Sequence, residues 1–251
     1  MKRYLQSSYR ILSFILFIVI WERVALFIDN SLLFPRVDQV GESLLKIMGS
    51  MEFLHTLYNT LSRLFLVILL SLLGATIVAT ISYKYKVVKQ LLSPFIVFLR
   101  AVPTIAIIIL VLIWSTTESV PIVVGSLILF PILYESILGA LNNSDVNLLK
   151  MSKIYRVPQK RVISDIYIPS VYYSIAPNFP SYIGLTFKVI IAGEVLSQES
   201  CSIGGEIFLN KIYLESSNIF AWIAIVIVIN YILENGLKRL NYMVSRSYRW
   251  K

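Results

Sequence analysis

Residues 150–170 read KMSKIYRVPQKRVISDIYIPS, a polar and strongly basic stretch that lies between two long apolar runs. The chain around it has 251 residues, of which 57% are hydrophobic and 15% are charged. A soluble domain has too little interior to bury so much apolar surface. The composition therefore indicates a membrane protein, in which this stretch is a connection that the bilayer leaves in water.

Apolar runs continue on both sides of the stretch, and helices are expected because a backbone group in lipid needs a partner within its own segment. We predict an all-α membrane protein with one domain, residues 1–251, and six spans: Ile11–Ile28, Leu57–Ser82, Leu91–Trp114, Val120–Leu141, Pro169–Leu196 and Ile219–Leu237. Pro94 and Pro103 interrupt the third run, which predicts an interfacial helix followed by a short span. No small-residue cleavage site follows the first run, which we interpret as an uncleaved span.

The basic residues of the connections test the topology. Only Arg36, Lys46 and Lys211 fall on one side of the predicted membrane. Sixteen fall on the other side, in both termini and two connections: Lys2, Arg3, Arg10, Lys84, Lys86, Lys89, Lys150, Lys153, Arg156, Lys160, Arg161, Lys238, Arg239, Arg246, Arg249 and Lys251. Because cytoplasmic connections carry the excess of Lys and Arg, both termini and residues 150–170 are predicted to be cytoplasmic in a multi-pass protein of the cell membrane.

The connection itself has the signals of two short helices. Residues 142–145, NNSD, are rich in N-cap types, so an amphipathic helix is expected to begin near Val146. Pro158 suits the start of a second helix. Charges surround apolar side chains such as Ile154 and Val157, which is typical of a docking surface for another protein. Packing of these side chains on the helix ends of the chain itself would give the same pattern, so both interpretations stay open.

Motifs along the chain extend this interpretation. The connection ends in Ile166-Tyr-Ile-Pro169, and the other motifs are WE at 21–22, LFP at 33–35, LHTLYNTLSR at 54–63, LLSPFIVFLRAVP at 91–103, GLTFKVIIAGE at 184–194, IGG at 203–205, FAW at 220–222 and RW at 249–250. In this order they resemble the permeases of ATP-binding cassette (ABC) importers, in the nitrate, sulfonate and taurine branch. The resemblance covers nearly the whole chain.

The resemblance implies the type I ABC importer permease fold and a set of partners. These are a second permease copy, two cytoplasmic ATPase subunits that bind ATP and Mg²⁺, and an extracytoplasmic solute-binding protein. The permease itself is not an enzyme and carries no cofactor. Residues 142–168 would form the loop that couples to the ATPase, through Leu148, Leu149, Lys150, Met151, Ile154, Tyr155, Arg156, Val157 and Pro158.

Two residues depart from the family pattern. Lys150 stands where the family has a glutamate, and Arg156 stands where it has a glycine. Glycine adopts positive φ without penalty, whereas Arg at such a position costs about 1 kcal/mol or forces another bend. The branch handles sulfonates, taurine, nitrate and heterocyclic vitamin precursors, and the sequence does not distinguish among them.

Ionisable residues within spans are costly and are candidates for a translocation path. Lys188 and Glu194 lie six residues apart, about 240° around a helix, so they cannot pair with each other. Glu135 is a further candidate, and a structural ion pair or snorkelling explains such residues equally well. The connection after the fifth span has Gly204-Gly205, where a tight turn could face the binding protein or serve only as a turn.

Other chemistry has weak support. Thr56, Asn59, Thr60 and Arg63 recur at helical spacing and form one polar face, which more often joins helices than binds a solute. One Cys and one His exclude an internal disulfide and a multi-histidine metal site. Scattered basic clusters do not favour nucleic acid, and no phosphate-binding glycine-rich loop is present. An ion-gradient-driven secondary transporter is the alternative, but the inverted repeat typical of that class is not visible.

Overall fold

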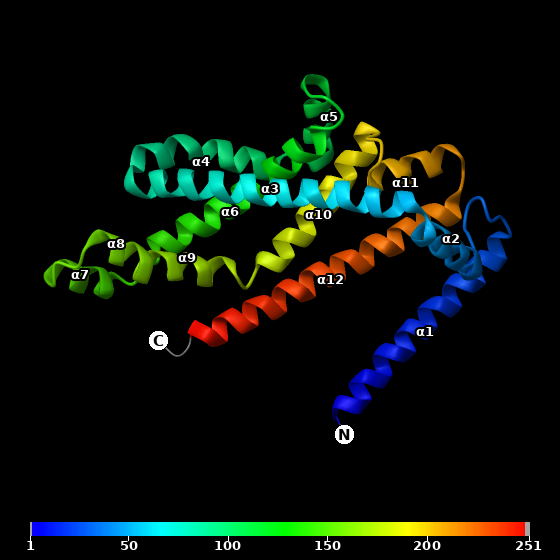
Figure 1. Cartoon of the computed structure of the whole chain (residues 1–251), viewed down its shortest axis with the longest axis horizontal. Helices are drawn as coiled ribbons and strands as arrows, with labels where there is room; N and C mark the ends of the chain where they lie inside the picture. Colours follow the sequence, from blue (N-terminus) through cyan, green and yellow to red (C-terminus); the bar gives the residue numbers. More distant parts are fainter. Residues whose placement is uncertain (1, 249–251) are drawn as a thin grey trace.

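The computed structural model describes the backbone of residues 2–248 and the side chains of residues 12, 13 and 15–244. Within this part of the chain all regular structure is helical (Figure 1). The helices are α1 (Lys2–Ile28), α2 (Val37–Gly49), α3 (Met51–Lys84), α4 (Lys86–Ala101), α5 (Thr104–Trp114), α6 (Val120–Asn142), α7 (Val146–Ile154), α8 (Gln159–Val162), the π-helix η1 (Ile163–Tyr167), α9 (Ile168–Ile175), α10 (Phe179–Ser197), α11 (Ile203–Ile212) and α12 (Ser216–Tyr248). The all-α prediction is confirmed.

Helix α3 forms the centre of the bundle and packs against α6 and α10. Its buried residues recur every three or four positions and are mostly small or hydroxylated: Thr56, Thr60, Leu64, Val67, Ser71, Ala75, Ala79 and Ser82. Small side chains allow helices in a membrane to approach closely. Gly125 of α6 shows how close, because a Cβ there would lie 3.1 Å from Val67 and 3.2 Å from Ile190.

The outer faces of the long helices are apolar, as contact with lipid requires. On α3, Leu66, Leu69, Leu73 and Ile77 are all more than 40% exposed. Among the residues that the structure describes, four helices, α3, α6, α10 and α12, are long and apolar enough to cross a bilayer, and the bent pair α4–α5 makes a fifth if it counts as one span. The first predicted span, Ile11–Ile28, falls within α1, where the side chains of residues 11 and 14 lie outside those described.

Two predicted spans are broken. In the third, α4 runs back beside α3 and α5 turns away from it by 105° (Figure 1). The break follows Ala101 at Pro103, whereas Pro94 lies inside α4. The fifth span was predicted as one helix over Pro169–Leu196. This prediction is wrong, because the segment forms two helices with a turn at residues 176–178 between them. Pro177 and Pro180 provide the reason, since proline has no N–H to donate and disfavours helix at the preceding residue.

Two short helices and one extension were not predicted. Helices α2 and α11 lie together at one end of the molecule, while α7 and α8 lie at the other (Figure 1). Helix α12 continues to Tyr248, beyond the predicted end at Leu237. Helix α1 stands apart and reaches the bundle through Trp21, whose indole N–H donates to the Pro35 carbonyl at 2.9 Å and whose ring packs on Phe220.

Candidate functional site

Helix α7 begins at Val146, where a helix was predicted, and the side chain of Asp145 caps its N-terminus. The Asp145 carboxylate accepts hydrogen bonds from the backbone N–H groups of Asn147 and Leu148, at 2.8 and 3.4 Å. A capping carboxylate satisfies N–H groups that have no partner within the helix and also interacts favourably with the helix dipole. The cap therefore holds α7 as a separate short helix at the end of α6.

Most of the predicted coupling residues are exposed. Leu148, Met151, Ile154 and Tyr155 are between 48% and 76% exposed. Of these, Leu148, Met151 and Tyr155 follow one another at intervals of three and four, so they share a helix face. Leu149 and Val157 are half-buried, whereas Lys150, Arg156 and Pro158 are exposed. The chain therefore presents an apolar face of α7 that it does not cover with its own helix ends.

The bend after α7 occurs at Arg156, the residue that stands in place of glycine. Arg156 has φ of 50°, which is the left-handed conformation. The N–H of Val157 donates to the Ser152 carbonyl at 2.8 Å, and the N–H of Arg156 donates to the Lys153 carbonyl at 3.2 Å. The bond from Val157 to Ser152 is the 6→1 bond of the Schellman motif, which closes a helix end and usually has a glycine at the left-handed position. The backbone at Arg156 therefore has a conformation that favours glycine, at the cost of strain for an arginine.

A continuous helical segment, formed by α8, η1 and α9, connects the bend to the bundle. Helix α9 packs on α6, and the hydroxyl groups of Tyr167 in η1 and Tyr83 in α3 lie 3.1 Å apart. Burial and this hydrogen bond raise the pKa of Tyr167 to about 12. An apolar hollow of about 490 Å³ lies beside this contact, between α3, α6, η1 and α9. Single π-helical turns within a helix, such as η1, are frequent at functional sites.

A buried ion cluster lies at the opposite end, where α3, α10 and α11 meet. The Arg63 guanidinium contacts Glu194 at 3.0 Å and Glu199 at 2.7 Å. The other Glu194 oxygen accepts from the Thr60 hydroxyl and from the N–H of Gly204, both at 3.1 Å. Glu194 is fully buried. The predicted polar face of α3 therefore joins helices, and Glu194 has partners for both oxygens.

Gly204 and Gly205 form the first turn of α11 rather than a tight turn in a loop, and both are buried. A Cβ on Gly204 would lie 2.4 Å from the Glu194 Cβ, and one on Gly205 would lie 1.9 Å from the Glu199 carbonyl oxygen. Glycine is needed at both positions because α11 approaches the end of α10 so closely. That these glycines face a binding protein stays a prediction.

The remaining path candidates are exposed. Glu135 of α6 forms an ion pair with Arg100 of α4, and the two side chains are 42% and 54% exposed. Lys188 is exposed on α10 and has no ion pair among the described residues. Charged groups in a membrane-spanning segment are expensive when lipid surrounds them. These exposed charged positions are therefore poorly suited to contact with hydrocarbon.

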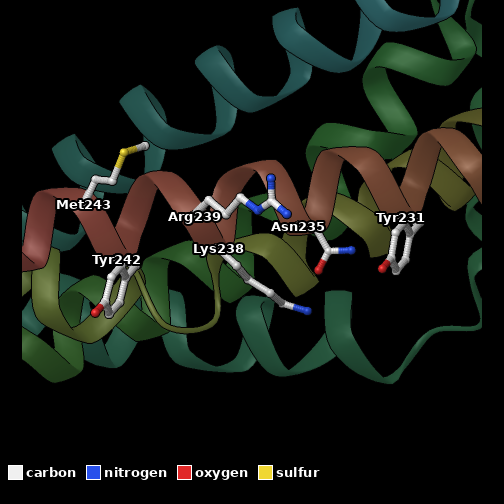
Figure 2. A pocket seen from close by; sticks show the side chains of 6 residues that line it. All are labelled: Tyr231, Asn235, Lys238, Arg239, Tyr242 and Met243. Carbon is white, nitrogen blue, oxygen red and sulfur yellow. The ribbon is translucent and has the colours of Figure 1, made fainter. Parts of the chain in front are cut away.

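Helix α12 has a shallow hollow of about 490 Å³ along its C-terminal half (Figure 2). Tyr231, Asn235, Lys238 and Tyr242 project to one side of the helix in this view, and Arg239 and Met243 project to the other. Lys238 also lies 3.5 Å from Glu234, one turn earlier. Aromatic and basic residues at the end of an apolar helix are typical of a membrane–water interface.

Sequence reasoning identified the members of the ion cluster but not their association. Glu194 was singled out as an ionisable residue in a span and Arg63 as part of a polar face, 131 positions apart. Glu199 was missed, since nothing in the local pattern separates it from other residues of a connection. The pairing of Glu135 with Arg100 became clear only from the packing of α4 on α6.

Comparison with known proteins supports the resemblance. The model of the family "Binding-protein-dependent transport system inner membrane component" matches residues 68–241, more than half of the chain. A putative ABC transporter permease of Methanocaldococcus jannaschii is 23% identical over 242 residues, covering 93% of this chain and 88% of the relative. The taurine transport system permease of Escherichia coli is 24% identical over 233 residues, covering 90% and 84%.

Proposed function

Because this chain belongs to the family of inner membrane components of binding-protein-dependent transport systems, we propose that it is the membrane-spanning subunit of an ABC importer. Two copies would enclose a path for a small solute that an extracytoplasmic binding protein delivers. Two ATPase subunits in the cytoplasm, which bind ATP and Mg²⁺, would supply the energy. Both termini and α7 would then be cytoplasmic, in agreement with the distribution of Lys and Arg.

The exposed apolar face of α7 is the observation that carries this proposal. An apolar face on a helix outside the membrane has neither lipid nor the chain's own core to cover it. Exposed apolar side chains surrounded by charges mark surfaces that bind proteins. Met151 and Tyr155 are the types of residue that contribute most at such interfaces. We assign this face to the ATPase subunit.

The elbow after α7 offers a route from the ATPase to the membrane helices. Movement of α7 would pass through Arg156 into the segment of α8, η1 and α9, which packs on α6. Helix α10 follows directly after the turn at residues 176–178. ATP-driven closure of the ATPase pair would thereby change the packing of the two permease copies, as a rigid-body switch between two states.

The solute path is assigned to the exposed charged residues Arg100, Glu135 and Lys188. Their exposure in a single chain suggests that a second copy, or a water-filled space between copies, replaces lipid there. Glu194 could line that path only in a state in which the Arg63 cluster has opened. For the solute we propose a small molecule of the nitrate, sulfonate, taurine or vitamin-precursor type, with the taurine permease relative as the support.

A pair of exposed tyrosines tests the assignment of α7. Tyr155 is 74% exposed at the end of α7, and Tyr213 is 70% exposed at the end of α11. With a purified candidate ATPase subunit as the probe, we expect Tyr155→Ala to weaken ATPase binding at least about tenfold, the loss of one strong interface contact. Tyr213→Ala should leave binding unchanged. Equal effects of the two substitutions on ATPase binding, measured by interferometry in nanodiscs, would contradict the assignment.

Uptake in proteoliposomes tests the wider proposal. Solute accumulation should require the binding protein, the ATPase and ATP together. Accumulation driven by an ion gradient without ATP would instead establish a secondary transporter. Lys150→Glu adds a test of specificity, because a partner matched to Lys150 should have an acidic or neutral rim and should bind the substituted chain less well.

A further inference from the structure

A polar hollow of about 250 Å³ lies at the end of the molecule opposite α7, between α2, α3, α11 and α12. Its polar wall consists of Lys46, Glu52, Thr56, Glu206, Asn210 and Asn218. None of these residues belongs to the Arg63 cluster, and none is one of the exposed path candidates Arg100, Glu135 and Lys188. In the proposed topology this end faces the side from which a binding protein would approach.

The two carboxylates of the hollow have no cation paired with them. No ion pair among the described residues includes Glu52, Glu206 or Lys46, although all three line the same space. Burial, and then the nearby charge of Glu52, raise the pKa of Glu206. The wall has one positive and two negative groups, so it is acidic in a chain whose formal net charge is +9.

Thr56, at the wall of the hollow, offers a further hydrogen-bonding group to this space. Thr56 is only 3% exposed and makes no hydrogen bond with another described residue. The neighbouring amides are satisfied, since Asn218 donates to the Asn210 side chain at 2.9 Å and Asn210 donates to the Glu206 carbonyl at 2.7 Å. The Thr56 hydroxyl is therefore free to accept a hydrogen bond from a donor that enters this space.

We propose that the hollow receives a lysine or arginine side chain of the extracytoplasmic binding protein, an inference that rests on the proposed function. The carboxylates of Glu52 and Glu206 and the Thr56 hydroxyl are acceptors, and ammonium and guanidinium groups have only donors. The volume is several times the roughly 30 Å³ that one water occupies in the liquid, so it fits the head of a long side chain. Two carboxylates in so wide a space do not provide the close ligand set that Mg²⁺ or Ca²⁺ requires.

The double variant Glu52→Gln/Glu206→Gln tests this assignment in the assembled transporter. Nanodiscs with the permease and a candidate ATPase would be titrated with a purified, solute-loaded candidate binding protein. Loss of a close charge contact at an interface is expected to weaken binding about 30-fold and to reduce its salt dependence. Glu118→Gln is the matched control, because Glu118 is exposed in the turn between α5 and α6 and does not line the hollow.

The readouts separate this inference from the proposed function. ATPase assembly and basal ATP hydrolysis should be normal in all variants, which also shows that the chain has folded. No binding of the binding protein to the wild-type transporter would overturn the proposed function and this inference together. Unchanged binding by the double variant, or equal weakening by Glu118→Gln, would overturn the inference alone.

Two further outcomes would reassign the hollow. Saturable Mg²⁺ or Ca²⁺ binding that the double variant abolishes, with the affinity for the binding protein unchanged, would identify a metal site. A changed KM for solute uptake with unchanged affinity for the binding protein would identify a solute subsite. Either result would overturn the assignment to a partner's side chain.

Discussion

The two ends of the molecule differ in how they accommodate charged groups, which are buried and paired at one end and exposed at the other. At the α11 end, Arg63, Glu194 and Glu199 are almost wholly buried, and each charge meets an opposite charge within 3.0 Å. At the α7 end, charged and apolar side chains stand exposed around a left-handed Arg156. The Arg63 cluster is closed by its own contacts, whereas the α7 surface is left for another molecule to cover.

The difference indicates where the chain is specified by itself and where it depends on a partner. A buried charge cluster tolerates little change, because removal of one member leaves the others without compensation. An exposed helix held by one cap and one bend tolerates substitution and responds to what binds it. Substitutions at the two ends should therefore differ most in their effect on the free energy of unfolding.

The largest effect is expected from Arg63→Ala. It leaves Glu194 buried without a cation, which should lower the free energy of unfolding by about 3–5 kcal/mol. Arg36→Ala is the control, since the Arg36–Glu22 pair is at least 30% exposed on both sides and should contribute about 1 kcal/mol or less. Both can be compared by denaturant unfolding in mixed micelles. A similar loss in the two variants would show that the cluster does not stabilise the α11 end.

A smaller effect is expected from Gly205→Ala, which tests how closely α11 approaches α10. The added Cβ would overlap the Glu199 carbonyl oxygen, a backbone atom that cannot move aside without moving the helix end. Such overpacking costs about 1–3 kcal/mol. Gly236→Ala on α12 has open space around it and should instead stabilise the helix by up to about 1 kcal/mol. Opposite shifts of the melting temperature are therefore predicted, and shifts of the same sign would refute the close approach.

At the α7 end, Arg156→Gly should be stabilising. The left-handed conformation costs an arginine about 1 kcal/mol more than a glycine, so the free energy of unfolding should rise by about that amount. The substitution should leave ATPase binding intact, because the bend is kept. Arg161→Gly, inside α8, is the control and should destabilise by about 1 kcal/mol. A destabilised Arg156→Gly chain would mean that contacts of the arginine outweigh its strain.

Much of the fold could be predicted from hydropathy and proline positions. Val120–Leu141 agrees with α6 within one residue, and the N-cap residues at 142–145 marked the start of α7. Helices α2 and α11 escaped prediction because they have 13 and 10 residues, too few to appear as membrane spans in the hydropathy pattern. Hydropathy also predicted α9 and α10 as one span, because the sequence is mostly apolar on both sides of the turn at Pro177.

The candidate sites were less accessible to sequence reasoning, for a physical reason. An exposed surface such as α7 is encoded locally, by residues that alternate charge and apolar character within two turns. The Arg63 cluster depends on three helices that meet, so spacing along one helix could exclude a Lys188–Glu194 pair but could not find the cation of Glu194. The pairing of Arg100 with Glu135 has the same origin.

The smallest predicted effect concerns Glu206, at the closed end but outside its ion cluster. Burial and Glu52 raise its pKa above the ordinary 4.5, while Lys46 is the cation on the same wall. A carboxyl with a raised pKa in the folded state stabilises the fold below pH 4.5, and this contribution is lost as the pH rises through the raised value. Glu206→Gln stays neutral, so its melting temperature relative to wild type should increase from pH 4.5 toward neutral pH, whereas Glu118→Gln should show no such trend. A constant difference would mean that neither burial nor Glu52 changes the titration of Glu206 on folding, and the contrast between an acidic pocket at this end and the basic surface at the other would weaken.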